Sequence, residues 1–119
     1  MSGSGNPPQP RTPFTSRTQS LVTGTGTFDD PFRVTTGVDA GATGIAIAQT
    51  DQYVQGEESY RTDLRIRNTS GATRTITLYR AGDCQLGDSD TGLGRLDPAT
   101  GGAACVAANG RILEWLPLG

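Results

Sequence analysis

Apolar and polar residues alternate with a period of two along much of the chain. The alternation is clearest over residues 60–68, YRTDLRIRN, where Leu64 and Ile66 stand on either side of Arg65. A period of two sends one set of side chains to a buried face and the other into water, as in an antiparallel sheet with one solvated side. We therefore predict a half-buried β-strand over residues 60–68.

A second alternating run, TRTITLYR, covers residues 73–80 and carries Ile76 and Leu78. The residues between the two runs, NTSGA, are typical of a turn. A strand, a turn and a second strand in succession predict a β-hairpin. We expect the hairpin of residues 60–80 to supply the rigid core of the fold.

Four further runs of strand-forming residues lie at positions 20–28, 31–38, 44–54 and 111–118. No segment carries a helical period. Six or seven short strands separated by turns are typical of an antiparallel β-sandwich, so we predict an all-β chain with one sandwich domain over residues 20–119. The proline-rich residues 1–19 are predicted to form a flexible leader or arm.

The last run, RILEWLPL, would be apolar on both faces of a strand. Such a strand needs cover on both sides. Either it is a central strand of the sandwich, or the chain is cut from a longer protein or docks its end on a partner. The side chains expected to contact a partner are Phe14 of the arm and, in this run, Ile112, Leu113, Trp115, Leu116 and Leu118.

The composition indicates a small core. Leu, Ile, Val and Phe together fill 22 of the 119 positions. A disordered chain would combine such low hydrophobicity with a high net charge, whereas the net charge here is −2. The 17 glycines and 17 threonines instead favour a chain rich in turns and strands.

Missing residue types exclude several activities. The chain has no histidine and no lysine, because all ten basic residues are arginine. This removes the imidazole base, the histidine-containing zinc site and Schiff-base chemistry. The acidic pairs Asp29–Asp30 and Glu57–Glu58 are adjacent in sequence, so their carboxylates would point to opposite sides of a strand. We therefore predict that the chain is not an enzyme.

Charge and hydropathy also limit the partners. A sequence pI near 4.9 provides no broad basic surface for nucleic acid. No apolar run approaches the length of a membrane span, so no membrane insertion is predicted. Other protein chains, including a second copy, are the expected partners.

The two cysteines, Cys84 and Cys105, flank a long loop rich in glycine, aspartate and alanine. A disulfide closing this loop would stabilise the fold by about 3 kcal/mol in the chain-entropy model. That contribution matters for a domain with so small a core. The alternative is a pair of buried free thiols in a reducing compartment.

The same loop contains the one acidic cluster with ligand-like spacing. Asp88 and Asp90 stand at the first and third positions of a calcium-type loop, where carboxylates can converge on one ion. The match is partial, because Gly92 occupies the fifth position and Leu93 the sixth, where an EF-hand requires glycine. The loop is thus either a calcium site of another kind or a simple turn, and no other cofactor is predicted.

Two polar rows are candidate ligand surfaces. An arginine stripe that could bind an anionic polymer consists of Arg61, Arg65 and Arg67, with Arg74 and Arg80 on the adjacent predicted strand. The alternative is a solvated sheet face. Thr75, Thr77 and Tyr79 form a polar row that would suit a sugar, although threonine is also an ordinary strand former.

The stretch YRTDLRIRNTSGATRTITLYRAGDC, continued to Trp115, resembles immunoglobulin-like sandwich modules of secreted or surface bacterial proteins, notably adhesion-related repeats. The shared motif is an alternating strand that ends in asparagine, Leu64–Asn68, followed by a small-residue turn at Thr69–Gly71. The resemblance covers about residues 60–118. It implies an immunoglobulin-like fold and a structural or adhesive role outside the cell, and it transfers no catalytic residue.

The sequence supports three interpretations of function. The first is a non-catalytic, secreted or cell-surface structural module that assembles with other protein chains. In that interpretation an exposed strand edge accepts a strand from a neighbour, and residues 11–28 are the expected donor. The second is a carbohydrate- or calcium-dependent surface-binding module. The third is a non-catalytic fragment of a secreted hydrolase.

Overall fold

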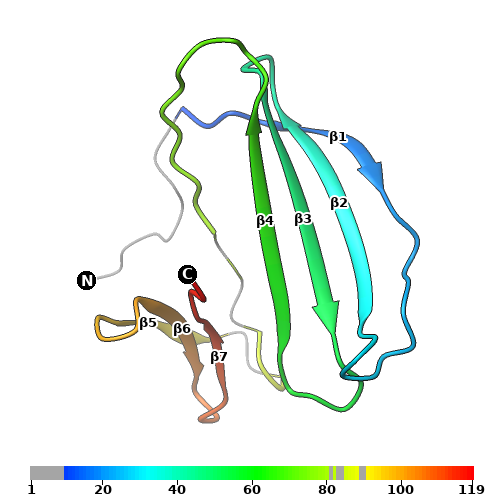
Figure 1. Cartoon of the computed structure of the whole chain (residues 1–119). Coiled ribbons are helices and arrows are strands. Elements are labelled where there is room, and N and C mark those ends of the chain that lie inside the picture. Colours follow the sequence, from blue (N-terminus) through cyan, green and yellow to red (C-terminus); the bar gives the residue numbers. More distant parts are fainter. Residues whose placement is uncertain (1–9, 81, 83–84, 89–90) are drawn as a thin grey trace. The chain divides into compact units, whose positions relative to one another are not determined.

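The computed structural model describes residues 10–80, 82, 85–88 and 91–119. These residues form seven β-strands and no helix (Figure 1). All the strand pairs are antiparallel, and the strands form one sheet of four and one sheet of three. The chain divides after Leu78 into two compact units, each of which contains one sheet. The prediction of an all-β, antiparallel chain is confirmed.

The first sheet is a simple up-and-down meander. It is built from β1 (Phe14–Gln19), β2 (Phe32–Ala40), β3 (Ile45–Tyr53) and β4 (Tyr60–Asn68), which lie side by side in that order. The strands predicted at positions 31–38, 44–54 and 60–68 are therefore confirmed. Each carries the β-branched or aromatic residues that suit a pleated, half-buried surface.

The strand β1 lies within the stretch that the sequence assigned to a leader or arm. It pairs with β2, and its register shifts between Ser16 and Thr18. The expected strand over residues 20–28 is reduced to a single bridge between Thr23 and Arg33. Thr and Gly alternate over residues 23–27, and the flanking Leu21, Val22 and Phe28 are all exposed, so little apolar burial holds a strand in place.

A hydrogen bond from Thr43 stabilises the turn between β2 and β3. The Thr43 hydroxyl donates to the carbonyl oxygen of Ala40 at 2.6 Å. Gly44 follows with a φ of 76°, a left-handed conformation that favours glycine. Its backbone also lies against Ser70, because a Cβ at this position would stand 2.7 Å from the Cβ of Ser70. The turn therefore needs glycine for two separate reasons.

Replacing Gly44 with alanine should destabilise the fold more than the same change at Gly71. Gly71 has a similar φ of 72° but open space around its missing Cβ. Both variants carry the left-handed penalty of about 1–2 kcal/mol, and only Gly44→Ala adds a clash, which costs about 1 kcal/mol or more. Urea unfolding of both variants measures the difference. Equal losses would show that the contact with Ser70 relaxes freely.

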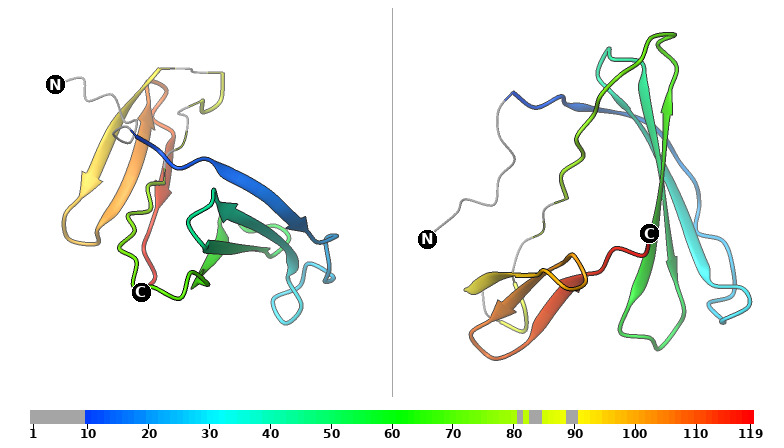
Figure 2. Two further views of the ribbon diagram at one scale, coloured as in Figure 1. Left: turned by 90° about the horizontal axis from the view of Figure 1, so that it is seen from above. Right: turned by 60° about the vertical axis from the view of Figure 1, so that its left-hand side comes forward.

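The expected hairpin over residues 60–80 is wrong, because residues 73–80 form no strand. The turn after β4 explains the difference. The amide and the hydroxyl of Thr69 both donate to the carbonyl oxygen of Gly44, at 2.7 and 2.9 Å. The turn is thus held at the β2–β3 connection, and the chain leaves the edge of β4 as an irregular coil (Figures 1 and 2).

The second sheet consists of β5 (Gly92–Asp97), β6 (Gly102–Ala107) and β7 (Ile112–Trp115), in that order. β5 and most of β6 lie in the stretch predicted to be a loop, because their small residues show little alternation of apolar and polar positions. The strand at the end of the chain is confirmed as β7. It is an edge strand, so the explanation of its two apolar faces as a central strand is wrong.

Few side chains in the described part of the chain are buried. The buried apolar residues are Ile45 and Ile47 of β3 and Cys105 and Ala107 of β6. Within each sheet, these buried apolar residues belong to one face of one inner strand. The small core that the composition predicts is therefore present as one small cluster per sheet.

Candidate functional site

The first sheet has one apolar face, which we define as the face that carries Ile47. The register places Val38 of β2 and Ile66 of β4 directly opposite Ile47 on either side. Ile47 is only 8% exposed, whereas Leu64 and Ile66 on the neighbouring edge strand are 41% and 42% exposed. Apolar burial therefore falls sharply from the centre of this face to its β4 edge.

A carboxylate interrupts the apolar face. The side chain of Asp51 lies in the same row as Val34 and Thr62. It accepts hydrogen bonds from the Gln49 amide at 2.9 and 3.1 Å and from the Thr62 hydroxyl at 2.6 Å. These donors satisfy the half-buried carboxylate within the sheet. The Asp51 cluster separates an aliphatic part of the face from an aromatic part.

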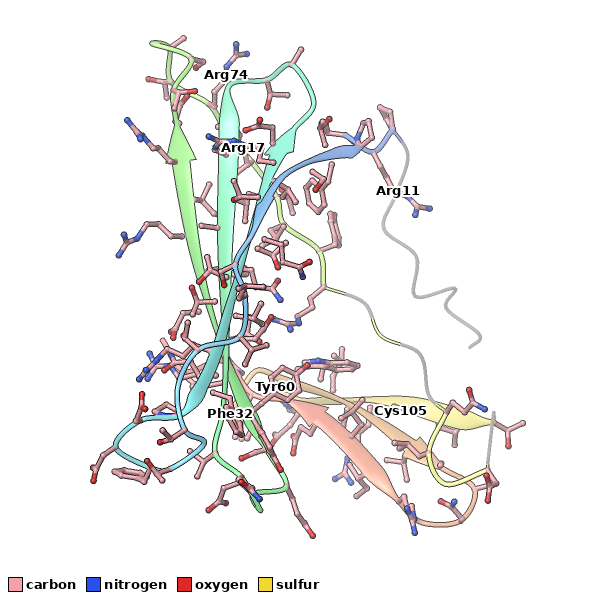
Figure 3. The ribbon with its side chains drawn as sticks, turned by 90° about the vertical axis from the view of Figure 1, so that its right-hand side faces the viewer. Arg11, Arg17, Phe32, Tyr60, Arg74 and Cys105 are labelled. Carbon is pink, nitrogen blue, oxygen red and sulfur yellow. The ribbon has the colours of Figure 1, made fainter. Side chains whose placement is uncertain are left out.

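The aromatic part is a row across three strands. Tyr53 of β3 lies between Phe32 of β2 and Tyr60 of β4 in the register, and Figure 3 shows Phe32 and Tyr60 at the same end of the sheet. Aromatic cross-strand pairs stabilise a sheet. The Tyr53 hydroxyl accepts the amide of Gly56 at 3.2 Å, which ties this row to the β3–β4 turn. The row could not be predicted from the sequence, because it depends on the register of the strands.

The opposite face of the sheet carries a polar ladder. The Arg33 Nε donates to the side-chain oxygen of Gln52 at 3.1 Å, and the Gln52 amide donates to Asp63 at 2.8 Å. Arg61 then donates to the other oxygen of Asp63 through its Nε and Nη2, at 3.0 and 2.7 Å. The ladder crosses three strands, and it uses one of the arginines proposed as a ligand contact.

Asp63 has a lowered pKa because it accepts the hydrogen bond of Arg61, and the charge of Arg61 and the bond from Gln52 add to the effect. A carboxyl group whose pKa is lower when folded stabilises the fold above its unfolded pKa. That contribution disappears as the pH falls through the folded value. The pair is exposed, so the effect on stability is small.

Replacing Arg61 with glutamine should therefore raise the pKa of Asp63 towards its ordinary value. An NMR titration that follows the side-chain carboxyl carbon of Asp63 measures the change. The matched control is Arg65→Gln, which removes an arginine from the same strand but not from the ladder. An equal rise in both variants would mean that general charge, and not the Arg61 hydrogen bond, sets this pKa.

Two other arginines of the stripe do not share the ion pair that Arg61 makes with Asp63. Arg65 and Arg67 share its sheet face, opposite Ala48 and Ala46, and neither has an ion-pair partner among the described residues. The predicted polar row of Thr75, Thr77 and Tyr79 lies in the irregular segment after β4. No sheet face brings these three residues together with Arg61 and Arg65.

The proposed calcium site cannot be described as a unit, because Asp90 lies outside the described residues. Asp88 has a φ of 63°, a left-handed conformation that aspartate tolerates in turns. Asp97, which follows in β5, accepts the amide of Ala99 at 2.9 Å and the Thr100 hydroxyl at 3.0 Å, and these bonds lower its pKa. Among the described residues, no group of three or more acidic or cysteine side chains could hold a metal.

The predicted disulfide also involves a residue outside the described range, Cys84. Cys105 lies on β6, opposite Gly94 and Leu113, and is buried. No free thiol occurs among the residues that the structure describes. The link between Cys84 and Cys105 stays a prediction.

The predicted contact residues lie in both units. Phe14 starts β1 at the same face as Val38, and it is exposed. Along β7, Leu113 and Trp115 share a face with Cys105, and Ile112 lies on the other face. The Trp115 ring lies against Gly82, where an added Cβ would meet it. Leu116 and Leu118 follow β7 and are exposed.

The two edges of the first sheet differ. The edge strand β1 is short and has an irregular register with β2, which is one way that proteins protect a sheet edge. The edge strand β4 pairs with β3 in unbroken register over all nine residues. The hairpin predicted from the sequence would have covered this edge with residues 73–80. The missing information was the long-range contact between Thr69 and Gly44, which holds the turn after β4 in another direction.

Comparison with known proteins returns no matching family model, no matching curated protein and no matching solved structure. No helix in the described part of the chain could cross a membrane.

Proposed function

We propose that this chain is a non-catalytic, extracellular structural or adhesion module that acts by assembling with other protein chains. The observation that carries the proposal is the exposed apolar surface at the β4 edge of the first sheet. Leu64 and Ile66 continue the apolar face past its buried centre, and β4, which bears them, has no strand partner on its outer side within the described residues. Exposed apolar surface beside an open edge is typical of an interaction site.

The finer fold is part of the same proposal. Each sheet has one face with buried apolar residues and one more polar face, which is the pattern of a sandwich layer. We propose an immunoglobulin-like β-sandwich with a Cys84–Cys105 disulfide. A disulfide fits a chain with so small a core, and an oxidising compartment outside the cytosol would maintain it.

The residues also support a non-catalytic role. The chain offers no histidine or lysine as a base. The carboxylates of Asp51, Asp63 and Asp97 are engaged by neighbouring donors, and these bonds hold strands and turns together. Their positions serve the architecture of the two sheets.

Light scattering coupled to size exclusion, on oxidised protein at several concentrations, tests the proposal. We expect a mass that rises with concentration to a multiple of 12.4 kDa. The double variant Leu64→Thr, Ile66→Thr should shift the protein towards the monomer, because it removes the exposed apolar side chains and keeps strand-forming residues. The matched control is Leu21→Thr, which changes a leucine that is 87% exposed in a loop. A constant monomer mass for the unmodified chain would contradict the proposal.

A further inference from the structure

We propose that the outer edge of β4, meaning its side away from β3, accepts residues Thr73–Leu78 of a second copy as an antiparallel fifth strand. This inference rests on the proposed assembly and names the surfaces that join. The donor proposed here differs from residues 11–28, the donor expected from the sequence. Those residues include β1, which already pairs with β2.

The hydrogen-bonding pattern identifies the acceptor groups. The Thr69 amide donates to the carbonyl oxygen of Gly44, so residues 69 and 44 form a hydrogen-bonded pair. Hydrogen-bonded and non-hydrogen-bonded pairs alternate along an antiparallel ladder. The backbone amides and carbonyls of Arg67 and Arg65 therefore also hydrogen-bond to β3. The backbone groups of Leu64 and Ile66 therefore point outward. Within the part of the chain that the structure describes, these groups make no backbone–backbone hydrogen bond outside the strand ladder.

The donor segment has the features of a strand without a partner. Within the described residues, the backbone of Thr73–Leu78 makes no hydrogen bond to another backbone group. Its threonines favour a strand conformation, and its residues alternate in polarity. Ile76 and Leu78 are 45% and 42% exposed, so they have apolar surface to bury.

The alternation sets the register of the added strand. An antiparallel alignment with Ile76 opposite Ile66 also places Leu78 opposite Leu64. All four side chains then extend the apolar face, and residues directly opposite each other share a face in such a ladder. The same register sets Thr77 opposite Arg65 on the polar face, where the threonine hydroxyl can stay in contact with water. A shift by one residue would place Ile76 and Leu78 in water.

A second copy fits the edge better than the chain's own segment does. The turn that joins β4 to the segment is fastened at Gly44 by Thr69, and the Asn68 amide donates to the carbonyl oxygen of Ala72 at 2.7 Å. Pairing within one chain would require this turn to be rebuilt. A segment supplied by another copy leaves the turn after β4 and its contact with Gly44 intact. Two copies can also exchange their segments reciprocally.

Cross-linking of two variants that each add one cysteine tests the inference. Arg65→Cys and Thr77→Cys would face each other in a non-hydrogen-bonded pair, whose Cα atoms lie about 4.5 Å apart, within disulfide reach. The two variants, each keeping the native cysteines, are mixed and oxidised with glutathione disulfide. We expect a covalent heterodimer that is lost on reduction. The control mixes Thr77→Cys with Thr18→Cys, which places the cysteine on the β1 edge, and should give little product.

The outcomes separate this inference from the proposed function. Oligomers in light scattering without the Arg65→Cys to Thr77→Cys link would overturn the inference and leave assembly standing. A chain that carries both cysteines and forms the link only within itself, as a monomer, would overturn both. Equal heterodimer yields from the β4 and β1 variants would also overturn the inference, because the link would not be specific to the β4 edge.

Discussion

Replacing Ile47 with alanine is expected to lower the free energy of unfolding by about 3 kcal/mol. Ile47 sits on β3 between Val38 and Ile66 and is one of the few buried apolar side chains in the described chain. Removing its buried carbons loses their transfer free energy and leaves a cavity that two paired strands can fill only in part. Because net stabilities are only about 5–15 kcal/mol, this loss is a large fraction of the free energy of unfolding.

Chemical unfolding in dilute solution measures the effect of Ile47→Ala. The matched control is Ile76→Ala, which makes the same change at a side chain that is 45% exposed and belongs to no strand. Its loss should stay below about 1 kcal/mol. Similar losses at both positions would show that the centre of the four-stranded sheet is not the main core.

Removing the proposed disulfide is expected to lower the free energy of unfolding by about as much as Ile47→Ala does. The twenty residues between Cys84 and Cys105 would form a closed loop, for which the chain-entropy model gives about 3 kcal/mol. The double variant Cys84→Ala, Cys105→Ala should therefore melt well below the oxidised protein. The oxidised protein after addition of a reductant should behave like the variant, with a small further difference from the side chains.

Thiol labelling of the unreduced, denatured protein provides the control for this prediction. A disulfide leaves neither cysteine reactive. Modification of both thiols without reduction, together with a melting temperature that is insensitive to reductant, would contradict the disulfide.

The strands that the sequence predicts well are those with large alternating side chains. In β3 and β4, Ile45, Ile47, Leu64 and Ile66 mark one face, and the register in the structure aligns them. The sequence does not reveal β6 because its alanines and glycine, in GAACVA, give almost no contrast between faces. Its strand depends instead on ladder bonds to β5 and β7, which are contacts between distant segments.

The hairpin over residues 60–80 failed for a different reason. Its local signals were sound, since the alternation of Ile76 and Leu78 and the turn at Gly71 both favour a hairpin. The competing contact is the bond from Thr69 to Gly44, twenty-five residues away, which holds the turn in another direction. Local pattern cannot show such a contact, and the open edge of β4 follows from it.

The sequence predicted some residue types of the candidate site, but not which side chains contact each other. The sequence singled out Arg61 and Arg65 together, but the structure separates them, because Asp63 engages only Arg61. Cross-strand partners such as Gln52 depend on which strand lies next to which. The same holds for the aromatic row of Phe32, Tyr53 and Tyr60, whose members are far apart in the chain.

Amide hydrogen exchange at low and high protein concentration tests the central claim most directly. The amides of Leu64 and Ile66 point away from β3, whereas those of Arg65 and Arg67 are held in the ladder and serve as internal references. We predict that the Leu64 and Ile66 amides exchange rapidly in dilute protein and slowly in concentrated protein, while the reference amides stay protected in both. Fast exchange of Leu64 and Ile66 at every concentration, or protection that does not depend on concentration, would contradict assembly at this edge.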